Sequence, residues 1–247
     1  MNKICIEHVT QLFSLPGKKE LTALQNIDLY VKQGELIAII GRSGCGKTTL
    51  LNLLAGLLKP SSGVITVSGQ PVTGPHYSRM MMFRQPCMLP WLTVEGNIAF
   101  GCKIRGEKEA LAEKVTRYID LMGLTGFEKV YPDGLSAGMM QRVAMARCVI
   151  GEPEILLMDE SFSDVDIFTR ATLYKLILDL WQRLGLTIIL VTHDIDEALL
   201  LGQRTILMGD RPGRIIHIFD TPLPYPRNLE DASLIAQKKE ILEHFNG

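Results

Sequence analysis

The chain has 247 residues, and its 26 Lys and Arg against 27 Asp and Glu give a formal charge of −1 with neutral histidines. This length fits one large domain, or one domain that carries an inserted subdomain. The balanced charge argues against a general attraction to nucleic acid or anionic lipid, and the 47% hydrophobic content argues against intrinsic disorder. The most apolar stretch, residues 50–58, is far below the ~20 residues of a membrane span, and the N-terminus lacks a signal-peptide pattern. We therefore expect a soluble protein.

The cysteines are five in number, widely spaced, and contain no C-x-x-C pair. A disulfide framework or a zinc site needs clustered cysteines. We therefore expect free thiols, as in a reducing cytosol.

The strand patterns come in two kinds. Residues 24–32 alternate apolar and polar side chains, which predicts a half-buried strand. Short continuous apolar runs, typical of parallel strands covered on both faces, occur at 36–40, 155–158 and 187–191. A helical pattern follows each run, at 47–57, at 167–184 and at 197–201. This alternation predicts an α/β fold with a parallel sheet and helices on both of its faces.

The middle third of the chain shows helical patterns with no strand between them, at residues 94–104, 107–122 and 136–149. An all-helical insertion into the α/β core is the simplest interpretation. The tail begins with three closely spaced prolines and ends in an amphipathic helix near 231–245. The expected division is a core of 1–85 and 148–220, a helical subdomain of 86–147 and a tail of 221–247.

Residues 41–48, GRSGCGKT, match the pattern G-x-x-x-x-G-K-[ST] between an apolar strand and a helix. Glycines allow a tight ring of backbone N–H groups around phosphate oxygens, and the helix dipole adds to it. Lys47 would face the β- and γ-phosphates, and the Thr48 hydroxyl would bind Mg²⁺. The strand–loop–helix context disfavours a fortuitous glycine-rich turn. The predicted nucleotide-binding residues are Gly41, Arg42, Ser43, Gly44, Cys45, Gly46, Lys47, Thr48 and Thr49.

Two acids and a histidine follow the later apolar runs. Asp159 is placed to hold Mg²⁺, and Glu160 to polarise a water, although an acidic helix start would look the same. His193 alone would more often be structural. Because parallel strands end on one rim, we expect Gly41, Glu160 and His193 to meet there. His193 would then hydrogen-bond the γ-phosphate or the attacking water.

Ser136 begins a helix shortly before the run at 155–158. It is a good N-cap, and the free N–H groups of the first turn form an anion site, although a simple capped helix is the alternative. A second phosphate-binding helix end suggests that ATP is held from two sides, in a head-to-tail dimer.

With these motifs in this order, the sequence resembles the ATPase subunits of ABC transporters, from about Cys5 to Arg227. The resemblance implies a P-loop NTPase (RecA-like) core with a mostly parallel sheet, N-terminal antiparallel strands and an inserted helical subdomain. Within that superfamily the chain is similar to the nitrate/sulfonate/taurine-type import ATPases, on the strength of residues 88–94, 211–215 and 223–227.

The resemblance also assigns roles to further residues. Phe13 would stack on adenine, although it could be an ordinary hydrophobic residue near an edge strand. Ser136, Ala137 and Gly138 would meet ATP across the dimer. Asp166 ends the loop that joins the two sites.

The implied cofactors are ATP and Mg²⁺. The implied partners are a second ATPase subunit, two membrane permease subunits and, indirectly, a periplasmic or lipid-anchored substrate-binding protein, with no nucleic acid. The chain would then lie at the cytoplasmic face of the membrane, held there by the permease. The permease would dock on the helical insertion, with residues 89–91 in the docking surface. Trp91 could equally be a core aromatic residue.

The sequence departs from the family pattern near the expected Mg²⁺ site. The family places Phe-Gln before the docking loop, with that Gln touching Mg²⁺. Here Phe83 is followed by Arg84, and the glutamine is Gln85. Either the loop bulges to restore Gln85 as the metal ligand, or Arg84 occupies the position.

Milder departures are Ala137 for the first signature glycine, Ser161 for a proline, and Asp164-Val165 for the usual Ala-Leu. Ala137 is tolerable if its φ stays negative. We expect normal nucleotide binding with slow turnover.

The leading interpretation is an ATPase that energises an importer for a small anionic solute, with Glu160 as general base aided by His193. One alternative is a regulatory nucleotide-binding subunit that hydrolyses ATP weakly. The other is a soluble ABC ATPase acting on nucleic acid or ribosomes, a class that usually carries two cassettes or basic surfaces.

Overall fold

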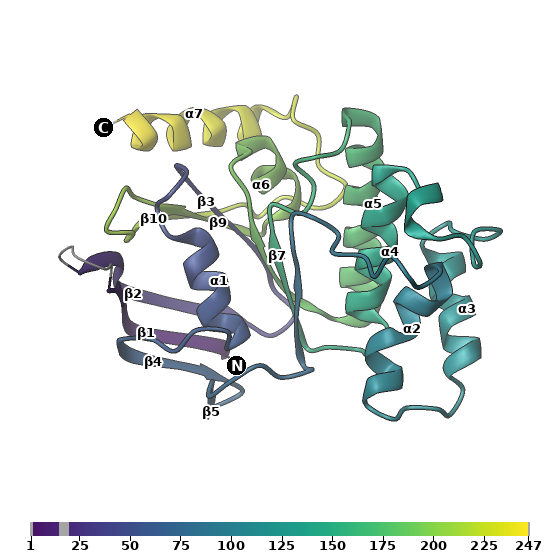
Figure 1. Cartoon of the computed structure of the whole chain (residues 1–247). Helices are drawn as coiled ribbons and strands as arrows, with labels where there is room; N and C mark the ends of the chain where they lie inside the picture. Colours follow the sequence, from purple (N-terminus) through teal and green to yellow (C-terminus); the bar gives the residue numbers. More distant parts are fainter. Residues whose placement is uncertain (1, 15–19, 247) are drawn as a thin grey trace. The chain divides into compact units, whose positions relative to one another are not determined.

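The computed structural model describes residues 2–14 and 20–246. The described residues form two compact units: one runs up to His76 and resumes at Leu186, and the other is Tyr77–Gly185. Both combine strands with helices, which confirms the α/β class (Figure 1). The second unit is larger than the predicted helical subdomain because it includes two strands and a further helix. The predicted domain limits stay a prediction.

The first unit contains an antiparallel sheet of strands in the order β2-β1-β4-β5. Its strands are β1 (Asn2–Phe13), β2 (Leu21–Lys32), β4 (Ser62–Val67) and β5 (Gln70–Pro71). In β2, Ile27, Leu29 and Val31 are buried, whereas Tyr30 and Lys32 are exposed. The alternation predicted for this strand is confirmed, as are the N-terminal antiparallel strands.

The same unit contains mostly parallel strands in the order β10-β9-β3-β8. They are β3 (Leu36–Gly41), β8 (Thr187–Val191), β9 (Arg204–Met208) and β10 (Ile215–Asp220), of which β10 is antiparallel to β9. Every residue of β3 and β8 is buried. The continuous apolar runs at 36–40 and 187–191 therefore form buried parallel strands, as predicted.

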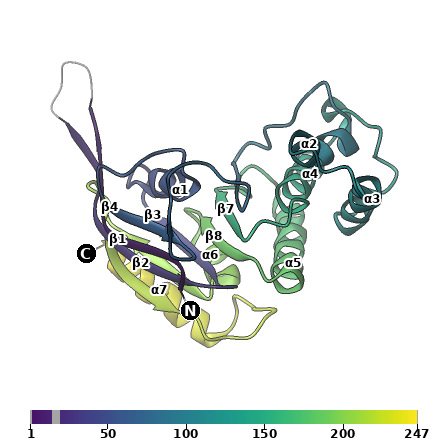
Figure 2. The same ribbon diagram turned by 90° about the horizontal axis from the view of Figure 1, so that it is seen from below.

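Helices cover both faces of these strands. Figure 2 shows α1 (Lys47–Ala55) on one side, and α6 (Ile195–Leu201) and α7 (Ala232–Asn246) on the other. Ala38 and Ile40 of β3 share a core cluster with Leu199 of α6 and Ile241 of α7. The predicted first helix, 47–57, is too long because Gly56 takes a left-handed conformation with φ 78° and ends α1.

A proline-rich segment after β10 supports the end of α6. The Tyr225 hydroxyl donates to Leu201 O at 2.5 Å, and Arg227 Nη1 donates to Leu199 O and Gly202 O at 2.6 Å each. These donors satisfy carbonyl groups that the end of a helix leaves unpaired.

The second unit pairs β6 (Arg79–Met82) in parallel with β7 (Ile155–Asp159) and carries the remaining helices. They are α2 (Val94–Ile104), α3 (Leu111–Leu121), a 3₁₀ turn (Pro132–Gly134), α4 (Ala137–Val149) and α5 (Ile167–Leu184). The helices α2, α4 and α5 match their predicted bounds. The helix α3 starts later than predicted because Gly106 and Ala110 have positive φ.

None of the helices in the described part of the chain combines the length and apolarity that crossing a membrane requires.

Asn97 of α2 fixes the loop before that helix. The side chain is fully buried, and its Nδ2 donates to Leu89 O, Leu92 O and Thr93 O at 2.9–3.1 Å. Its Oδ1 accepts from Leu89 N at 2.9 Å. Trp91, in the same loop, is 68% exposed. The alternative that Trp91 is a core aromatic residue is therefore wrong.

We expect Asn97→Ala to lower the free energy of unfolding by about 2–3 kcal/mol, because buried backbone groups lose their partners. Urea unfolding followed by circular dichroism measures the change. Gln182→Ala, which removes an exposed amide from α5 of the same unit, is the matched control. Equal midpoints for Asn97→Ala and this control would contradict the assignment.

Candidate functional site

The phosphate-loop motif occupies a tight turn between β3 and α1. Gly44 and Gly46 have φ of +82° and +105°, a region that side chains rarely adopt. A Cβ at Gly46 would lie 2.6 Å from Leu24 Cδ2, so the position is closed sterically as well. The backbone conformation thus requires glycine at these positions. This requirement favours a phosphate-binding loop over a fortuitous glycine-rich turn.

Lys47 is folded into this loop. Its side chain is 6% exposed, and Nζ donates to Gly41 O at 2.8 Å and to Arg42 O at 3.1 Å. Thr48 is exposed at the start of α1, and Thr49 is half-buried. The ammonium group therefore lies where the loop encloses it, and the Thr48 hydroxyl lies on the accessible side.

Cys45 is 1% exposed inside the loop. Burial raises the pKa of its thiol, an effect that the nearby Lys47 charge partly opposes. The side chain is therefore a buried thiol within the loop.

A second segment, 211–215, supports the phosphate loop. Arg211 Nη2 donates to Gly44 O at 3.2 Å, and Gly213 N donates to Ala23 O at 2.9 Å. A Cβ at Gly213 would lie only 2.0 Å from Cys45 O. The contact of this segment with the phosphate loop was not predicted from the sequence. The available signal for this contact was Gly213, which lies between Arg211 and Arg214.

Arg42, at the exposed side of the loop, contacts two other parts of the first unit. It pairs with Asp210 at 3.3 Å and donates from Nη2 to Phe245 O at 3.0 Å. These contacts tie the loop to the end of α7.

His193 lies at the same edge as the phosphate loop. The parallel register pairs Ile39 of β3 with Val191 of β8, so Gly41 and His193 each lie two residues beyond that pair. The Thr192 hydroxyl donates a hydrogen bond to the buried Glu197 carboxylate, and Asp194 is the N-cap of α6. The structure thus brings Gly41 and His193 to one edge of the sheet, while the position of Glu160 relative to them stays a prediction.

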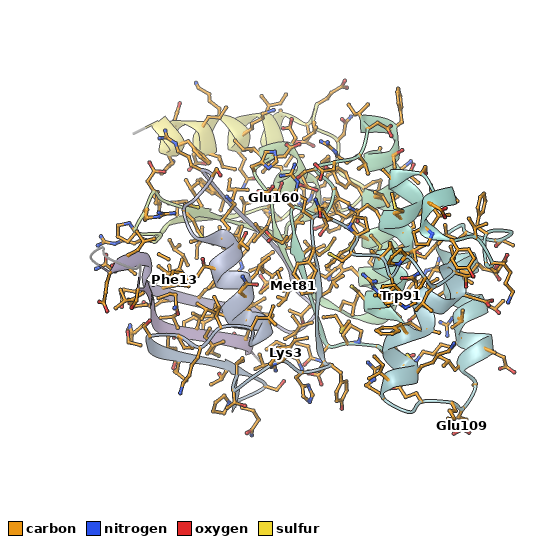
Figure 3. All side chains as sticks on the ribbon, in the orientation of Figure 1. Lys3, Phe13, Met81, Trp91, Glu109 and Glu160 are labelled. Atoms are coloured by element: carbon orange, nitrogen blue, oxygen red, sulfur yellow. The ribbon has the colours of Figure 1, made fainter. Side chains whose placement is uncertain are left out.

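Phe13 is the last residue of β1, half-buried and paired with Leu21 (Figure 3). Its stacking on adenine stays a prediction.

The second unit brings Arg84 and Glu160 together. Met82 of β6 pairs in parallel with Met158 of β7, and Arg84 and Glu160 each lie two residues beyond that pair. Asp159 is the half-buried last residue of β7. Glu160 follows with φ 48°, a strained value that is often found at functional sites.

Arg84 pairs with two carboxylates. Its Nη2 lies 2.6 Å from Asp164 Oδ1, its Nε lies 3.0 Å from Asp164 Oδ2, and its Nη1 lies 3.5 Å from Glu160 Oε2. The guanidinium holds the pKa of the Asp164 carboxyl below its ordinary value. Gln85 is exposed. The Mg²⁺ role of Gln85 stays a prediction.

The segment 136–138, which was predicted to meet ATP across the dimer, lies at the start of α4. Ser136 is the N-cap, and its Oγ accepts from Met139 N at 3.3 Å. Ala137 is the first helical residue, so its backbone does not require glycine. Gly138 is buried, and a Cβ there would lie 2.4 Å from Thr169 Cγ2 of α5. The replacement of the first signature glycine is therefore tolerated, whereas Gly138 is required for close packing.

Asp166 caps α5. Its Oδ1 accepts from the N–H groups of Phe168 and Thr169 at 3.0 Å each, and the bonds to Thr169 and Phe168 hold the pKa of the carboxyl below its ordinary value. Arg170 Nη2 donates to Val165 O at 3.2 Å, which fixes the loop before the helix.

Comparison with known proteins gives consistent matches. Residues 24–163 match the model of the ABC transporter family. The chain is 42% identical over 240 residues to the taurine import ATP-binding protein TauB of Jannaschia sp. (strain CCS1), covering 97% of this chain and 89% of that protein. It is 38% identical over 242 residues to the aliphatic sulfonates import ATP-binding protein SsuB of Bacillus cereus, covering 98% and 95%.

The fold is similar to solved ATP-binding cassettes. One of them, a dimer in a post-hydrolysis state bound to ADP and Pi, superposes with a TM-score of 0.77 at 26% identity, covering 90% of this chain and 100% of that one.

We expect Gly213→Ala to weaken nucleotide binding by at least about tenfold, because the added Cβ displaces the loop at Cys45. Titration with a fluorescent ATP analogue measures the affinity. Gly74→Ala is the matched control, since a Cβ there meets nothing within 4 Å and φ is not positive. Parent-like affinity in Gly213→Ala would show that segment 211–215 does not support the loop.

Proposed function

The chain belongs to the ABC transporter family as an ATP-binding subunit, and on this premise we propose that it powers an importer for a small anionic solute of the nitrate, sulfonate or taurine type. It is an ATPase whose hydrolysis of ATP is coupled to transport. The solute class is supported by the taurine and sulfonate importers among its relatives. The observation that carries the proposal is the glycine-built loop around Lys47, formed at the edge where His193 also lies.

In this proposal residues 41–49 hold the phosphates of ATP. Backbone N–H groups of the loop and of the start of α1 donate hydrogen bonds to the phosphate oxygens, and Lys47 exchanges its carbonyl partners for phosphate oxygens. Thr48 and Asp159 would hold Mg²⁺, because a hydroxyl and a carboxylate are the oxygen donors that this ion prefers. When bound, Mg²⁺ neutralises charge that develops on the phosphates.

Glu160 is the proposed general base, and it takes a proton from the attacking water. His193 is proposed to hydrogen-bond the γ-phosphate or that water. The exposed ring of His193 stands beside the capped start of α6, so its backbone is fixed while its side chain is accessible.

The subunit is proposed to work as a head-to-tail dimer with a second ATPase subunit. Ser136 and Ala137 are exposed at the N-terminus of α4, where unpaired N–H groups suit a phosphate. Asp166 stands exposed at the start of α5. Phe13 is the proposed adenine contact, and Gln85 is the remaining proposed Mg²⁺ ligand.

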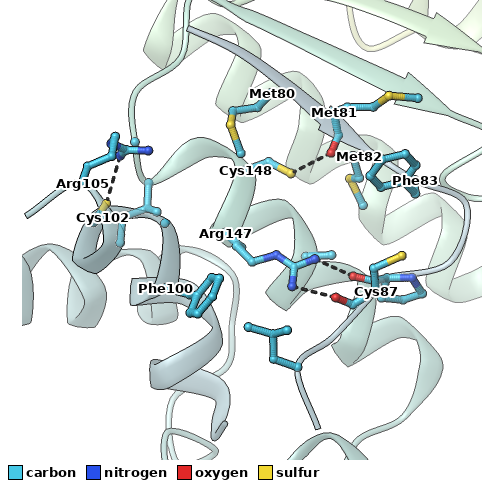
Figure 4. A pocket seen from close by; sticks show the side chains of 16 residues that line it. Met80, Met81, Met82, Phe83, Cys87, Phe100, Cys102, Arg105, Arg147 and Cys148 are labelled. Atoms are coloured by element: carbon cyan, nitrogen blue, oxygen red, sulfur yellow. Dashed lines mark hydrogen bonds between the residues drawn. The ribbon is translucent and has the colours of Figure 1, made fainter. Parts of the chain in front are cut away.

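A cavity of about 300 Å³ in the second unit is the proposed docking groove for a permease helix (Figure 4). Its lining is mostly apolar and includes Met80, Met82, Phe100 and Leu89, the last of which belongs to the predicted docking surface. The guanidinium of Arg147 in its wall is already bonded to Pro86 O at 2.7 Å and Cys87 O at 2.9 Å. The groove therefore suits an apolar helix, and the import function of the relatives supplies a permease as its source.

Docking of this kind places the subunit at the cytoplasmic face of the membrane, with a substrate-binding protein as an indirect partner. A regulatory subunit with weak hydrolysis is the second candidate, because the Arg84 guanidinium lies beside the proposed base.

Glu160→Gln should lower ATP hydrolysis by at least about 100-fold and leave ATP binding intact, because the amide cannot accept the proton of water. Steady-state phosphate release, with the permease present, measures the rate. Glu109→Gln is the control, because Glu109 is exposed and lies in the same unit at a distance from Glu160 (Figure 3). Parent-like hydrolysis in Glu160→Gln would remove the base assignment, and negligible hydrolysis by the parent would favour the regulatory subunit.

Phe100→Asp should abolish co-purification with the permease, because a charge in the groove costs several kcal/mol to desolvate against an apolar helix. Phe127→Asp changes an aromatic residue of the same unit that is exposed to a similar extent and lies outside the groove. Thermal unfolding of both variants checks their folding. Undiminished co-purification of a folded Phe100→Asp variant would place the docking surface elsewhere.

A further inference from the structure

The helix α7 contacts two segments that the proposed function places at the nucleotide. Near its end, the carbonyl of Phe245 accepts from Arg42 Nη2 of the phosphate loop at 3.0 Å. Earlier on the same helix, Lys238 Nζ donates to Asp196 Oδ2 at 2.8 Å. Asp196 lies in the first turn of α6, three residues after His193. One helix therefore joins the segment that follows β3 to the segment that follows β8 (Figure 1).

The apolar face of α7 fixes the helix on the sheet. Leu234 and Ile241 are buried in one core cluster with Ala38 and Ile40 of β3, and Phe245 packs against that cluster. The spacing of these residues along α7 puts them on one face of the helix. Because an α-helix rises 1.5 Å per residue, its two polar contacts are held about 10 Å apart along its axis. A helix packed in this way keeps the partners of those contacts at a constant separation.

The two partners lie where strand pairing alone does not hold them together. The ladder between β3 and β8 ends at Ile39 and Val191, two residues before Gly41 and His193. Asp196 is joined to the backbone beside His193, because its N–H donates to Asp194 Oδ1 at 2.9 Å. The contact with Lys238 therefore fixes the turn that carries His193.

We propose that α7 is a positioning element of the ATPase, in which Lys238 holds the turn that carries His193 and the Phe245 carbonyl holds the phosphate loop. The inference rests on the proposed function, in which residues 41–49 bind the phosphates and His193 hydrogen-bonds the γ-phosphate or the attacking water. Lys238 is a positioning residue, since it acts through Asp196 and His193 and touches no reacting atom.

The exposure of the ion pair separates this role from a purely structural one. The side chains of Lys238 and Asp196 are 43% and 35% exposed, and ion pairs this accessible to water contribute little to folding. A displacement of about 1 Å in a catalytic group, by contrast, can lower a rate by ~100-fold. Loss of Lys238 should therefore lower kcat and leave the unfolding midpoint unchanged.

The first test measures kcat, KM for ATP and thermal unfolding of the full-length chain in Lys238→Met, which keeps the length of the side chain and removes its charge. We expect kcat to fall by about tenfold, because the turn at His193 loses its support, with an unchanged KM and unfolding midpoint. Lys238→Arg keeps a cation beside Asp196 and should restore most of the rate.

Lys239→Met is the matched control. Lys239 is 81% exposed, and its ion-pair partner is Glu243 of the same helix, so this substitution leaves the contact with α6 intact. It should match the parent. Parent-like kcat in Lys238→Met would overturn the inference, and so would an equal loss in Lys239→Met.

The second test removes Phe245, which anchors the end of α7. Phe245→Ala should weaken the binding of a fluorescent ATP analogue by about three- to tenfold, the range expected for one net hydrogen bond, because the loop loses the support of Arg42. Leu242→Ala, at an exposed position on the same helix, is the control. Equal affinities of the two variants would show that α7 does not hold the loop.

His193→Ala separates the inference from the proposed function. In this background the further substitution Lys238→Met should have no effect on kcat, and an additional loss would show that Lys238 does not act through His193. Parent-like hydrolysis in His193→Ala would refute the proposed role of His193 and, with it, that of Lys238. Slow hydrolysis in His193→Ala together with parent-like Lys238→Met would refute the inference alone.

Discussion

The parallel register of two strand pairs is the constraint on which the candidate site depends. Pairing Ile39 with Val191 brings Gly41 and His193 to one edge of the sheet, and pairing Met82 with Met158 brings Arg84 and Glu160 together. A shift of one residue in either pair would turn the functional side chain to the other face. The buried apolar runs that form these strands therefore do two things: they bury surface, and they fix which polar residues emerge together at the strand ends.

Much of this arrangement was predictable because it rests on periodic patterns. The inner strands and the helices α2, α4 and α5 follow from continuous or helically spaced apolar residues. The Arg84–Asp164 pair could not be predicted in this way. Both residues lie in exposed turns, and no periodic pattern links positions 80 residues apart. The late start of α3 was missed for a related reason: the left-handed conformation of Ala110 leaves no mark in hydrophobicity.

The motifs that make the chain similar to one group of import ATPases prove to be supports for other elements. In segment 211–215, Gly213 packs closely against the phosphate loop. Arg227 donates hydrogen bonds to carbonyl groups at the end of α6. Neither segment supplies a group for the chemistry of hydrolysis. Their sequence is specific because backbone-to-backbone packing and bonds to free carbonyls leave few acceptable side chains. Resemblance in such motifs therefore reports a shared scaffold and does not identify a solute.

The buried Cys45 thiol has a consequence for the chemistry of the loop. Oxidants and alkylating agents react with exposed thiolates, whereas this sulfur is enclosed and burial raises the pKa of its thiol. The phosphate loop can therefore carry a cysteine at its centre and still withstand oxidative conditions, for as long as the loop stays closed over it. Exposure of that sulfur would report opening of the loop, so the protein contains a natural reporter of the state of its own nucleotide cradle.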